Sequence, residues 1–233
     1  MEQNYANQVQ VMQEQLAALA KAYLNKIYGW MAVSMLVTAG VAMYAMNSDA
    51  VLTWSANNQI ILLIATLGSI LIMAFCRNML TSGALGVIFI AFSGLEGLAL
   101  GPLLSLYTTQ SLGLTFACTA GMFGAMALYG AVTKRNLSGM GRTLMMLLFG
   151  LIIAGIANIF FGNSTADLII SAVGVVVFAL FTAYDTQRLL AEGAYLTDSV
   201  DRSKGAILGA VQLYLDFLNL FLYLLRFLGA ARD

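Results

Sequence analysis

The sequence predicts an all-α polytopic membrane protein with seven transmembrane helices. Of the 233 residues, 61% are hydrophobic and 9% are charged, and the mean hydropathy is +0.85. A soluble globular protein typically carries about 25% charged residues, so this composition excludes an ordinary soluble domain. The apolar residues also gather into long runs, each close to the ~20 residues that a spanning helix needs.

Seven apolar runs define the expected helices, and polar stretches separate them. We expect a single membrane domain over residues 27–229, because one helical bundle accounts for this length. A long polar connector, residues 186–205, precedes the last run. The runs are Ile27–Met46, Ile60–Cys76, Gly83–Tyr107, Leu112–Val132, Thr143–Phe161, Leu168–Tyr184 and Ile207–Leu228.

Short tails flank this domain. Residues 1–26 are rich in Gln and Asn, with a short apolar stripe at Leu16, Leu19, Ala20 and Tyr23. They are expected to form a surface helix or a mobile tail. A signal peptide is not indicated, because the polar lead is long and the apolar run after it has full spanning length. Residues 230–233 form the C-terminal tail.

The positive charges predict the orientation. Lys and Arg occur before the first run and in every second connection after it, whereas residues 47–58, 107–112 and 162–167 contain none. The positive-inside rule therefore places the N-terminus in the cytoplasm. Seven crossings then place the C-terminus outside, against the charges of Arg226 and Arg232. A re-entrant seventh segment, returning the tail to the cytoplasm, is the alternative.

Composition excludes several functions. The net charge is zero, which argues against nucleic acid as a partner. The absence of His excludes haem and His-zinc sites, and it removes the usual switch near neutral pH. Cys76 and Cys118 form no C-x-x-C motif, so no redox site is indicated. We expect no cofactor.

Two aspartates are the centre of any functional interpretation. Asp216 lies ~14 Å along a helix that begins at Ile207, close to the midplane of a bilayer core about 30 Å thick. A lone charge there costs at least ~3 kcal/mol on insertion scales and usually faces a water-filled path or a partner. Asp185 lies near the cytoplasmic end of the preceding, antiparallel helix. Both carboxylates can therefore share one cavity.

Such a pair suggests a pH-sensitive cation site. Two carboxylates in a poorly solvated site do not both ionise easily, so they can sense pH without His. They also offer the hard oxygen ligands that calcium prefers. Arg77, at the same membrane face, is the expected latch that pairs with Asp185 and closes the path. Glu96 is a third acid within the membrane and either lines the same path or pairs locally.

Structural explanations of these residues stay open beside the functional one. Asp185 fits an interfacial residue in a polar connector, and Asp216 fits a hydrogen-bonding link to Asn219 or Gln212. Small residues recur every four positions at Ser93, Gly97 and Gly101, at Gly121 and Ala125, and at Gly150 and Ala154. This spacing lets helices approach closely. It favours packing within one chain, with dimerisation as the alternative.

An enzyme is not expected. Paired intramembrane carboxylates also occur in aspartyl proteases, where they activate water. The Gly-x-Gly-Asp motif of those enzymes is absent here, because Leu213–Tyr214–Leu215 precedes Asp216. Their Pro-Ala-Leu motif is absent too, since Leu103 follows the single proline, Pro102. A Ser nucleophile with a His base is excluded by the lack of His.

Three motifs resemble the Bax inhibitor-1 family, also called the transmembrane Bax inhibitor motif family. The last run, Leu213–Gly229, reads LYLDFLNLFLYLLRFLG and resembles the signature of that family's last helix. Ala183–Gln187 (AYDTQ) resembles its helix-6 motif, and Thr133–Ser138 (TKRNLS) resembles its basic connector. The resemblance covers residues 20 to 230, and the short chain looks like a bacterial inner-membrane member.

The resemblance implies a fold, an activity and residue roles. It implies six helices around a central seventh helix and a pH-sensitive calcium leak. Asp185 and Asp216 match the family's pH-sensing pair, and Arg77 matches an arginine that pairs with the helix-6 aspartate when the path is closed. One departure concerns the second apolar run. A glutamate can occur there in the family, whereas this chain has Thr66 and Ser69, so Glu96 is the candidate substitute.

We therefore expect a channel that passes calcium or another cation through a path gated by Asp185, Asp216 and Arg77, with Asn219 and Glu96 as path-lining candidates. Asp185 and Asp216 are also the expected calcium ligands. A second hypothesis is a non-conducting regulator that binds membrane-protein quality-control machinery through its N-terminal tail. A third, proton-coupled transport of a small solute, fits the buried acids but has no substrate motif.

Overall fold

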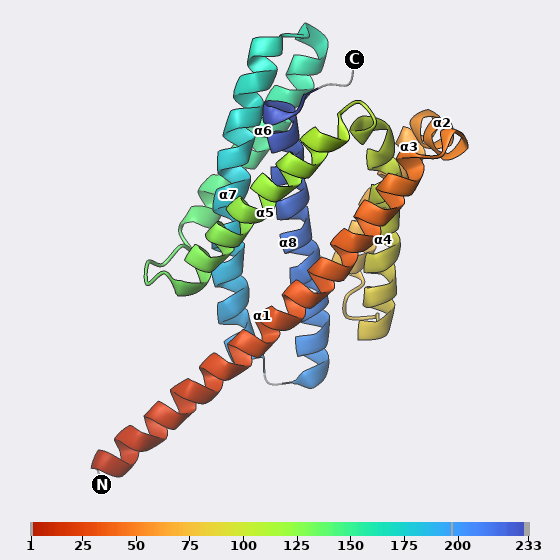
Figure 1. Cartoon of the computed structure of the whole chain (residues 1–233). Coiled ribbons are helices and arrows are strands. Elements are labelled where there is room, and N and C mark those ends of the chain that lie inside the picture. Colours follow the sequence, from red (N-terminus) through yellow and green to blue (C-terminus); the bar gives the residue numbers. More distant parts are fainter. Residues whose placement is uncertain (1, 197, 231–233) are drawn as a thin grey trace.

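The chain folds into a bundle of long helices. The computed structural model describes residues 2–196 and 198–230. Within these ranges all regular structure is helical (Figure 1), in line with the predicted fold class. The helices are α1 (Glu2–Met46), α2 (Asp49–Asn57), α3 (Gln59–Phe75), α4 (Ser82–Leu104), α5 (Thr109–Val132), α6 (Met140–Phe161), α7 (Ser164–Tyr195) and α8 (Ser199–Leu228).

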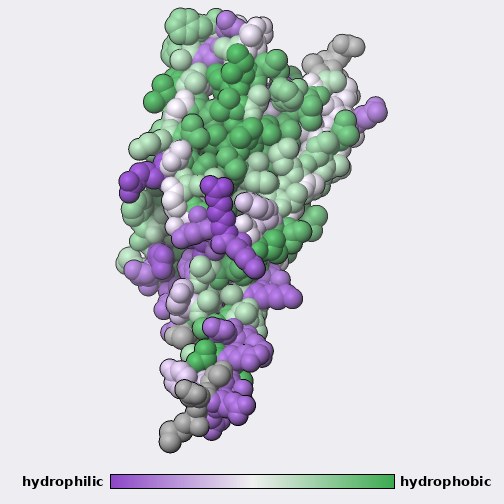
Figure 2. All heavy atoms as spheres, turned by 90° about the vertical axis from the view of Figure 1, so that its left-hand side faces the viewer, coloured by the Kyte–Doolittle hydropathy of each residue, from purple (hydrophilic) through white to green (hydrophobic). Residues whose placement is uncertain are grey.

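The bundle has the length and surface of a polytopic membrane protein. Six described helices, α1 and α4 to α8, are each long and apolar enough to cross a bilayer. The helices α2 and α3 meet at a 76° bend and pass the same test as a pair, which gives up to seven spans. The face shown in Figure 2 carries a broad hydrophobic band, with hydrophilic side chains gathered below it. This is the distribution expected of a surface that faces lipid.

The chain runs up and down through the bundle. The connections α3–α4, α5–α6 and α7–α8 lie at the lower end in Figure 1, on the side where α1 projects. The connections α4–α5 and α6–α7 lie at the upper end. The connections rich in Lys and Arg therefore share one end, which we call the basic end, as the charge pattern predicts.

Helix α8 is the centre of the bundle. It packs against α1, α4, α5 and α7, and its buried side chains point in all directions around its axis. Leu213, Tyr214 and Leu220 are completely buried. A helix that is apolar all round has to be enclosed by others, and the expected central seventh span is confirmed.

The helices extend beyond the apolar runs. Residues 186–205, expected as a long connector, are mostly helical, because α7 continues to Tyr195 and α8 begins at Ser199. Asp198 caps α8 by accepting a hydrogen bond from the backbone N–H of Val200 (2.8 Å). Hydropathy marks only the part of a helix that lies in lipid, whereas polar residues continue the same helix in water.

The terminal segments also differ from a simple tail–domain–tail picture. Residues 2–26 are the first part of α1 and enter the first span without a break, projecting from the basic end (Figure 1). Helix α8 is unbroken from Ser199 to Leu228, so it is not a re-entrant segment. Residues 231–233 of the C-terminal tail, including Arg232, lie outside the described residues.

Small residues bring α4 against α1, within one chain. A side chain on Gly97 would place its Cβ 2.7 Å from the carbonyl oxygen of Thr38, and one on Gly101 would come within 2.8 Å of Ala45. Both glycines are buried, as is Ser93. The expected close packing within the chain is therefore confirmed for this face. By contrast, Gly121 and Gly150 face open space.

Candidate functional site

The AYDTQ motif of α7 is held from outside by the α5–α6 connection. The side chain of Gln187 accepts a hydrogen bond from the backbone N–H of Leu137 (2.8 Å) and donates one to the carbonyl of Arg135 (2.9 Å). Gly141 leaves room for the ring of Tyr184. Because these contacts fix how α7 is rotated about its axis, Asp185 points inward, toward α8.

Asp185 and Asp216 come together between α7 and α8. Asp185 is 1% exposed and Asp216 is 6% exposed. Each lies on a buried side of its helix where α7 packs against α8, and the two carboxyl groups are near enough to interact electrostatically. Two carboxyl groups that interact in a poorly solvated site titrate as a pair rather than separately. The burial of Asp185 also rules out an exposed interfacial position.

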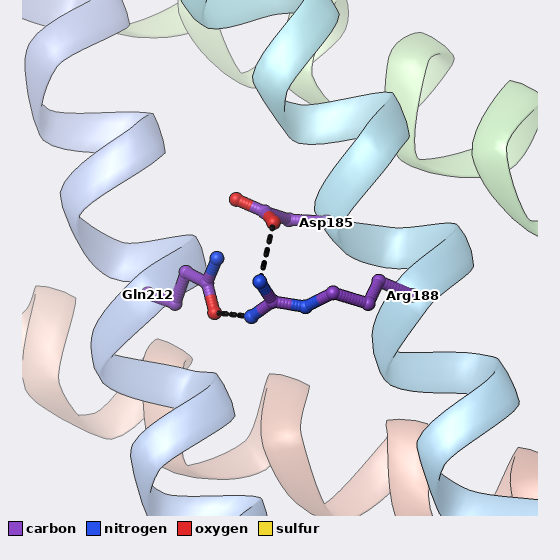
Figure 3. A network of polar contacts seen from close by, with 3 residues as sticks. All are labelled: Asp185, Arg188 and Gln212. Carbon is purple, nitrogen blue, oxygen red and sulfur yellow. Dashed lines mark hydrogen bonds and ion pairs between the residues drawn. The ribbon is translucent and has the colours of Figure 1, made fainter. Parts of the chain in front are cut away.

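Arg188 and Gln212 complete this group, as Figure 3 shows. The guanidinium of Arg188 lies 3.9 Å from the carboxylate of Asp185, one helical turn earlier on α7. It also donates a hydrogen bond to the side-chain oxygen of Gln212 on α8. One cation therefore links the acid of α7 to the polar face of α8.

Arg188 connects the buried acids to the basic end. Its side chain is 49% exposed, whereas that of Asp185 is 2% exposed. Its guanidinium lies 5.9 Å from the centre of the Tyr184 ring, close enough for a cation–π contact. Arg188 also helps to line a pocket of about 270 Å³ on the outer side of α7, together with Asn136, Ser138, Tyr184, Gln187 and Ala191. It therefore lies between this pocket and the carboxyl pair.

The pair retains spare acceptor capacity. Oδ1 of Asp185 and Oδ2 of Asp216 receive no hydrogen bond from a donor in the described part of the chain. Buried acceptors without donors are rare and call for a physical explanation. The charge of Arg188 offsets part of this cost, because its guanidinium lies 3.9 Å from Oδ1 of Asp185.

Arg77 does not contact the pair in this structure. It is exposed, in the turn after α3, and its carbonyl accepts a hydrogen bond from Nζ of Lys204 (3.3 Å). Among the residues that the structure describes, Asp185 forms an ion pair with Arg188 and none with Arg77. The position expected for Arg77 is thus taken by an arginine three residues from the acid.

In the described part of the chain, no hydrogen bond or ion pair joins Glu96 or Asn219 to the pair. Glu96 is half-buried on α4 and near enough to Tyr214 to act on it electrostatically. Tyr214 and Asp216 point about 200° apart on α8, so Glu96 faces the other side of this helix. The amide of Asn219 donates to the carbonyl of Leu215 in its own helix (2.8 Å).

A second buried polar group joins α1, α4 and α8. The hydroxyl of Thr38 lies 2.8 Å from the hydroxyl of Tyr214 and 2.9 Å from the carbonyl of Ser93. The edges of Phe89 and Phe92 surround the tyrosine ring, at centroid distances of 5.7 and 5.6 Å. Sequence reasoning missed this contact, because nothing local links residues that are 176 positions apart. By contrast, the ion pair of Asp185 and Arg188 could have been predicted from the sequence, because residues i and i+3 lie on the same helix face.

Comparison with known proteins shows the family of this chain. Residues 20–233 match the family described as "Inhibitor of apoptosis-promoting Bax1". The chain belongs to the Bax inhibitor-1 family. The resemblance drawn from the AYDTQ and last-helix motifs is thereby confirmed. The family is a membrane family and not a known enzyme family.

Individual Bax inhibitor-1 relatives cover nearly the whole chain. The inner membrane protein YbhL of Escherichia coli K12 is 42% identical over 91% of this chain and 93% of its own length. An uncharacterized protein of Deinococcus radiodurans is 35% identical over 97% of both chains. A Golgi anti-apoptotic protein of vaccinia virus is 30% identical over 90% of this chain and 86% of its own.

Proposed function

We propose that this protein is a pH-sensitive calcium leak channel of the bacterial inner membrane, with its N-terminus in the cytoplasm. The observation that carries the proposal is the carboxyl pair, Asp185 with Asp216, buried between two spanning helices, with the guanidinium of Arg188 beside Asp185. Burying such charges is costly, so they usually serve an ion or proton path. The long apolar helices and the relatives are those of a membrane protein. We propose in addition that the protein conducts ions and that it selects calcium.

The described conformation fits the closed state of this channel. Arg188 binds Asp185 and Gln212 at the same time, which ties α7 to α8 on the side of the basic end. Protonation of the pair removes the negative charge that holds Arg188, so the arginine can swing out toward water. The path then opens in acid. Arg77 is kept as a second candidate latch, acting in a conformation in which the α3–α4 turn moves inward.

The oxygen atoms around the carboxyl pair favour a site that a cation passes through over a site that binds it tightly. Calcium takes six to eight oxygen ligands in a tight site. The described residues contain no group of three or more acidic or thiol side chains that could hold a metal. Two carboxylates and the Gln212 oxygen give a weak site, and conduction needs a site that an ion can leave.

The test is calcium flux into liposomes that contain the purified protein, measured from acidic to alkaline pH. We expect flux to lose its pH dependence in Asp185→Asn and Asp216→Asn, because the amide cannot titrate. Asp167→Asn is the matched control, since Asp167 lies 3.9 Å from Arg226 at the other end of α7 and is half exposed. The gating proposal would be wrong if both site variants fold and their flux shows the same pH profile as the unaltered protein.

A regulator that does not conduct is the second candidate, and the projecting part of α1 favours it. Tyr5, Val9, Met12, Leu16 and Leu19 follow a 4-3-4-3 spacing on one face of this helix. Of these, Tyr5, Met12 and Leu16 are exposed by 72%, 63% and 39%. An apolar seam of this spacing suits a partner helix. The test deletes residues 1–20 and compares the truncated protein with the full-length one. A partner that co-purifies only with the full-length protein, with no calcium flux through either form, would favour the regulator.

A further inference from the structure

A shallow groove lies on the outward face of α1, next to the basic end. Lys26, Gly29, Trp30 and Val33 line it, and it encloses about 520 Å³. These positions are three and four residues apart, so they share one helix face. Gly29 forms an open floor, because a Cβ at this position would meet nothing within 4 Å. The ring of Trp30 rests against Gly86 of α4 and forms a fixed wall.

Two hydrogen bonds at the lower end of this groove connect three segments that each carry a basic residue, Lys26, Lys204 and Arg77. Lys26 of α1 donates a hydrogen bond to the hydroxyl of Ser203 on α8 (2.9 Å). The next residue, Lys204, donates to the carbonyl of Arg77 in the α3–α4 turn (3.3 Å). Within the described ranges, none of the three cations forms a salt bridge. The carboxylate of Glu192 also lies near this corner, because its oxygen would be 3.6 Å from a Cβ on Gly205, so three basic side chains face one acidic one.

The groove and the cations lie at different depths of the expected bilayer. The apolar run of α1 begins at Ile27, so Lys26 lies at the level of the lipid headgroups and Val33 lies about 10 Å deeper. Tryptophan is enriched at this interface, where Trp30 is found. Basic pockets between spanning helices on the cytoplasmic side bind anionic headgroups.

We propose that this site binds one anionic phospholipid of the inner leaflet. The phosphate lies against Lys26, Arg77 and Lys204, and an acyl chain lies in the groove over Gly29, beside Trp30. An anionic lipid is favoured over a zwitterionic one, because a choline or ethanolamine cation would offset the attraction. The bound lipid joins α1, α8 and the α3–α4 turn at one point. This proposal does not depend on the channel function.

The two tryptophans make the test specific. The chain has two tryptophans, so Trp54→Phe leaves Trp30 as the only indole. Trp54 lies in α2, outside the groove. This protein is reconstituted in phosphatidylcholine vesicles that contain brominated phosphatidylglycerol or brominated phosphatidylcholine, and quenching of Trp30 is measured. We expect a higher relative binding constant for brominated phosphatidylglycerol, which high salt weakens.

Substitution of the cations separates a site from a general surface charge. Lys26→Gln and Lys204→Gln should each lower the preference for phosphatidylglycerol by up to about fivefold, at roughly 1 kcal/mol per basic residue. Lys134→Gln, in the exposed α5–α6 connection, is the matched control and should change nothing. Gly29→Leu fills the groove without a steric clash and should reduce quenching by brominated phosphatidylglycerol.

Two results would overturn the lipid site. One is equal quenching of Trp30 by the two brominated lipids at low salt. The other is a preference that survives in the double variant Lys26→Gln/Lys204→Gln, or that falls equally in Lys134→Gln. Either result would reduce the basic corner to the ordinary charge of a cytoplasmic membrane face.

Discussion

At the scale of single residues, Arg188 controls the charge beside the acid pair. Its guanidinium lies 3.9 Å from Asp185 and is half exposed, so it favours the ionised form of the pair. Without this cation a proton binds more readily, and the pair becomes protonated at higher pH. We expect Arg188→Gln to move the pH dependence of calcium flux to higher pH. Flux at neutral pH should rise with it.

Two further substitutions distinguish Arg188 from the arginine that the sequence singles out. Arg188→Lys keeps the charge but loses the fork that reaches Asp185 and Gln212 together, so it should give a smaller shift than Arg188→Gln. Arg77→Gln should leave the pH profile close to that of the unaltered protein if the described contacts determine gating. A larger shift for Arg77→Gln than for Arg188→Gln would restore Arg77 as the latch.

At the scale of helices, the contact of α5 with α7 sets the position of Asp185. A methyl group on Gly130 of α5 would overlap the carbonyl oxygen of Ala183, two residues before the aspartate. We expect Gly130→Ala to destabilise the protein by about 1–3 kcal/mol, the usual cost of overpacking, and to alter the pH profile of flux. Thermal unfolding in detergent measures the first effect.

Gly124 provides the control on the same helix. A Cβ there would meet nothing within 4 Å, so Gly124→Ala should change stability by less than about 0.5 kcal/mol. Equal unfolding temperatures for Gly130→Ala and Gly124→Ala would show that α5 and α7 are not in close contact at this point. The comparison isolates packing, because both variants make the same chemical change in the same helix.

The spanning helices could be predicted from the sequence, but the helix ends and the short helix α2, which lies in an expected connection, could not. Apolar runs located every span, since hydropathy reports the length that lies in lipid. They placed a connector over residues 186–205, where α7 and α8 continue in water and the cap at Asp198 marks the true start of α8. The same limit hid the continuity of α1, whose first part is polar and still helical.

At the scale of the whole molecule, the sequence identified the acids but not their surroundings. Asp185 and Asp216 could be singled out because each charge interrupts or ends an apolar run. Their meeting depends on how α7 is rotated, which Gln187 and the α5–α6 connection determine. The partner of Asp185 depends on packing too, and for that reason Arg188 and not Arg77 is found beside it.

The whole-molecule prediction concerns the side of the C-terminus. Alternation of the helices places the end of α8 opposite the basic end (Figure 1). Arg226 opposes this orientation by charge, but it lies 3.9 Å from Asp167 at the start of α7. This half-exposed pair lowers the net positive charge there. We therefore expect an odd number of crossings, with the C-terminus outside the cytoplasm.

Reporter fusions test this topology. Alkaline phosphatase fused after Asp233 should be active, because it needs the outer compartment, and green fluorescent protein at the same point should be dark. Fusions after Ser138, in the basic α5–α6 connection, should give the reverse pattern. Fluorescence from the C-terminal fusion would require six crossings, with α2 and α3 entering and leaving on one side. That arrangement would put Lys26, at the start of the first span, on the opposite side from the α7–α8 connection, although Lys26 contacts Ser203 there (2.9 Å). A fluorescent C-terminus would thus contradict both the topology and the proposed lipid site.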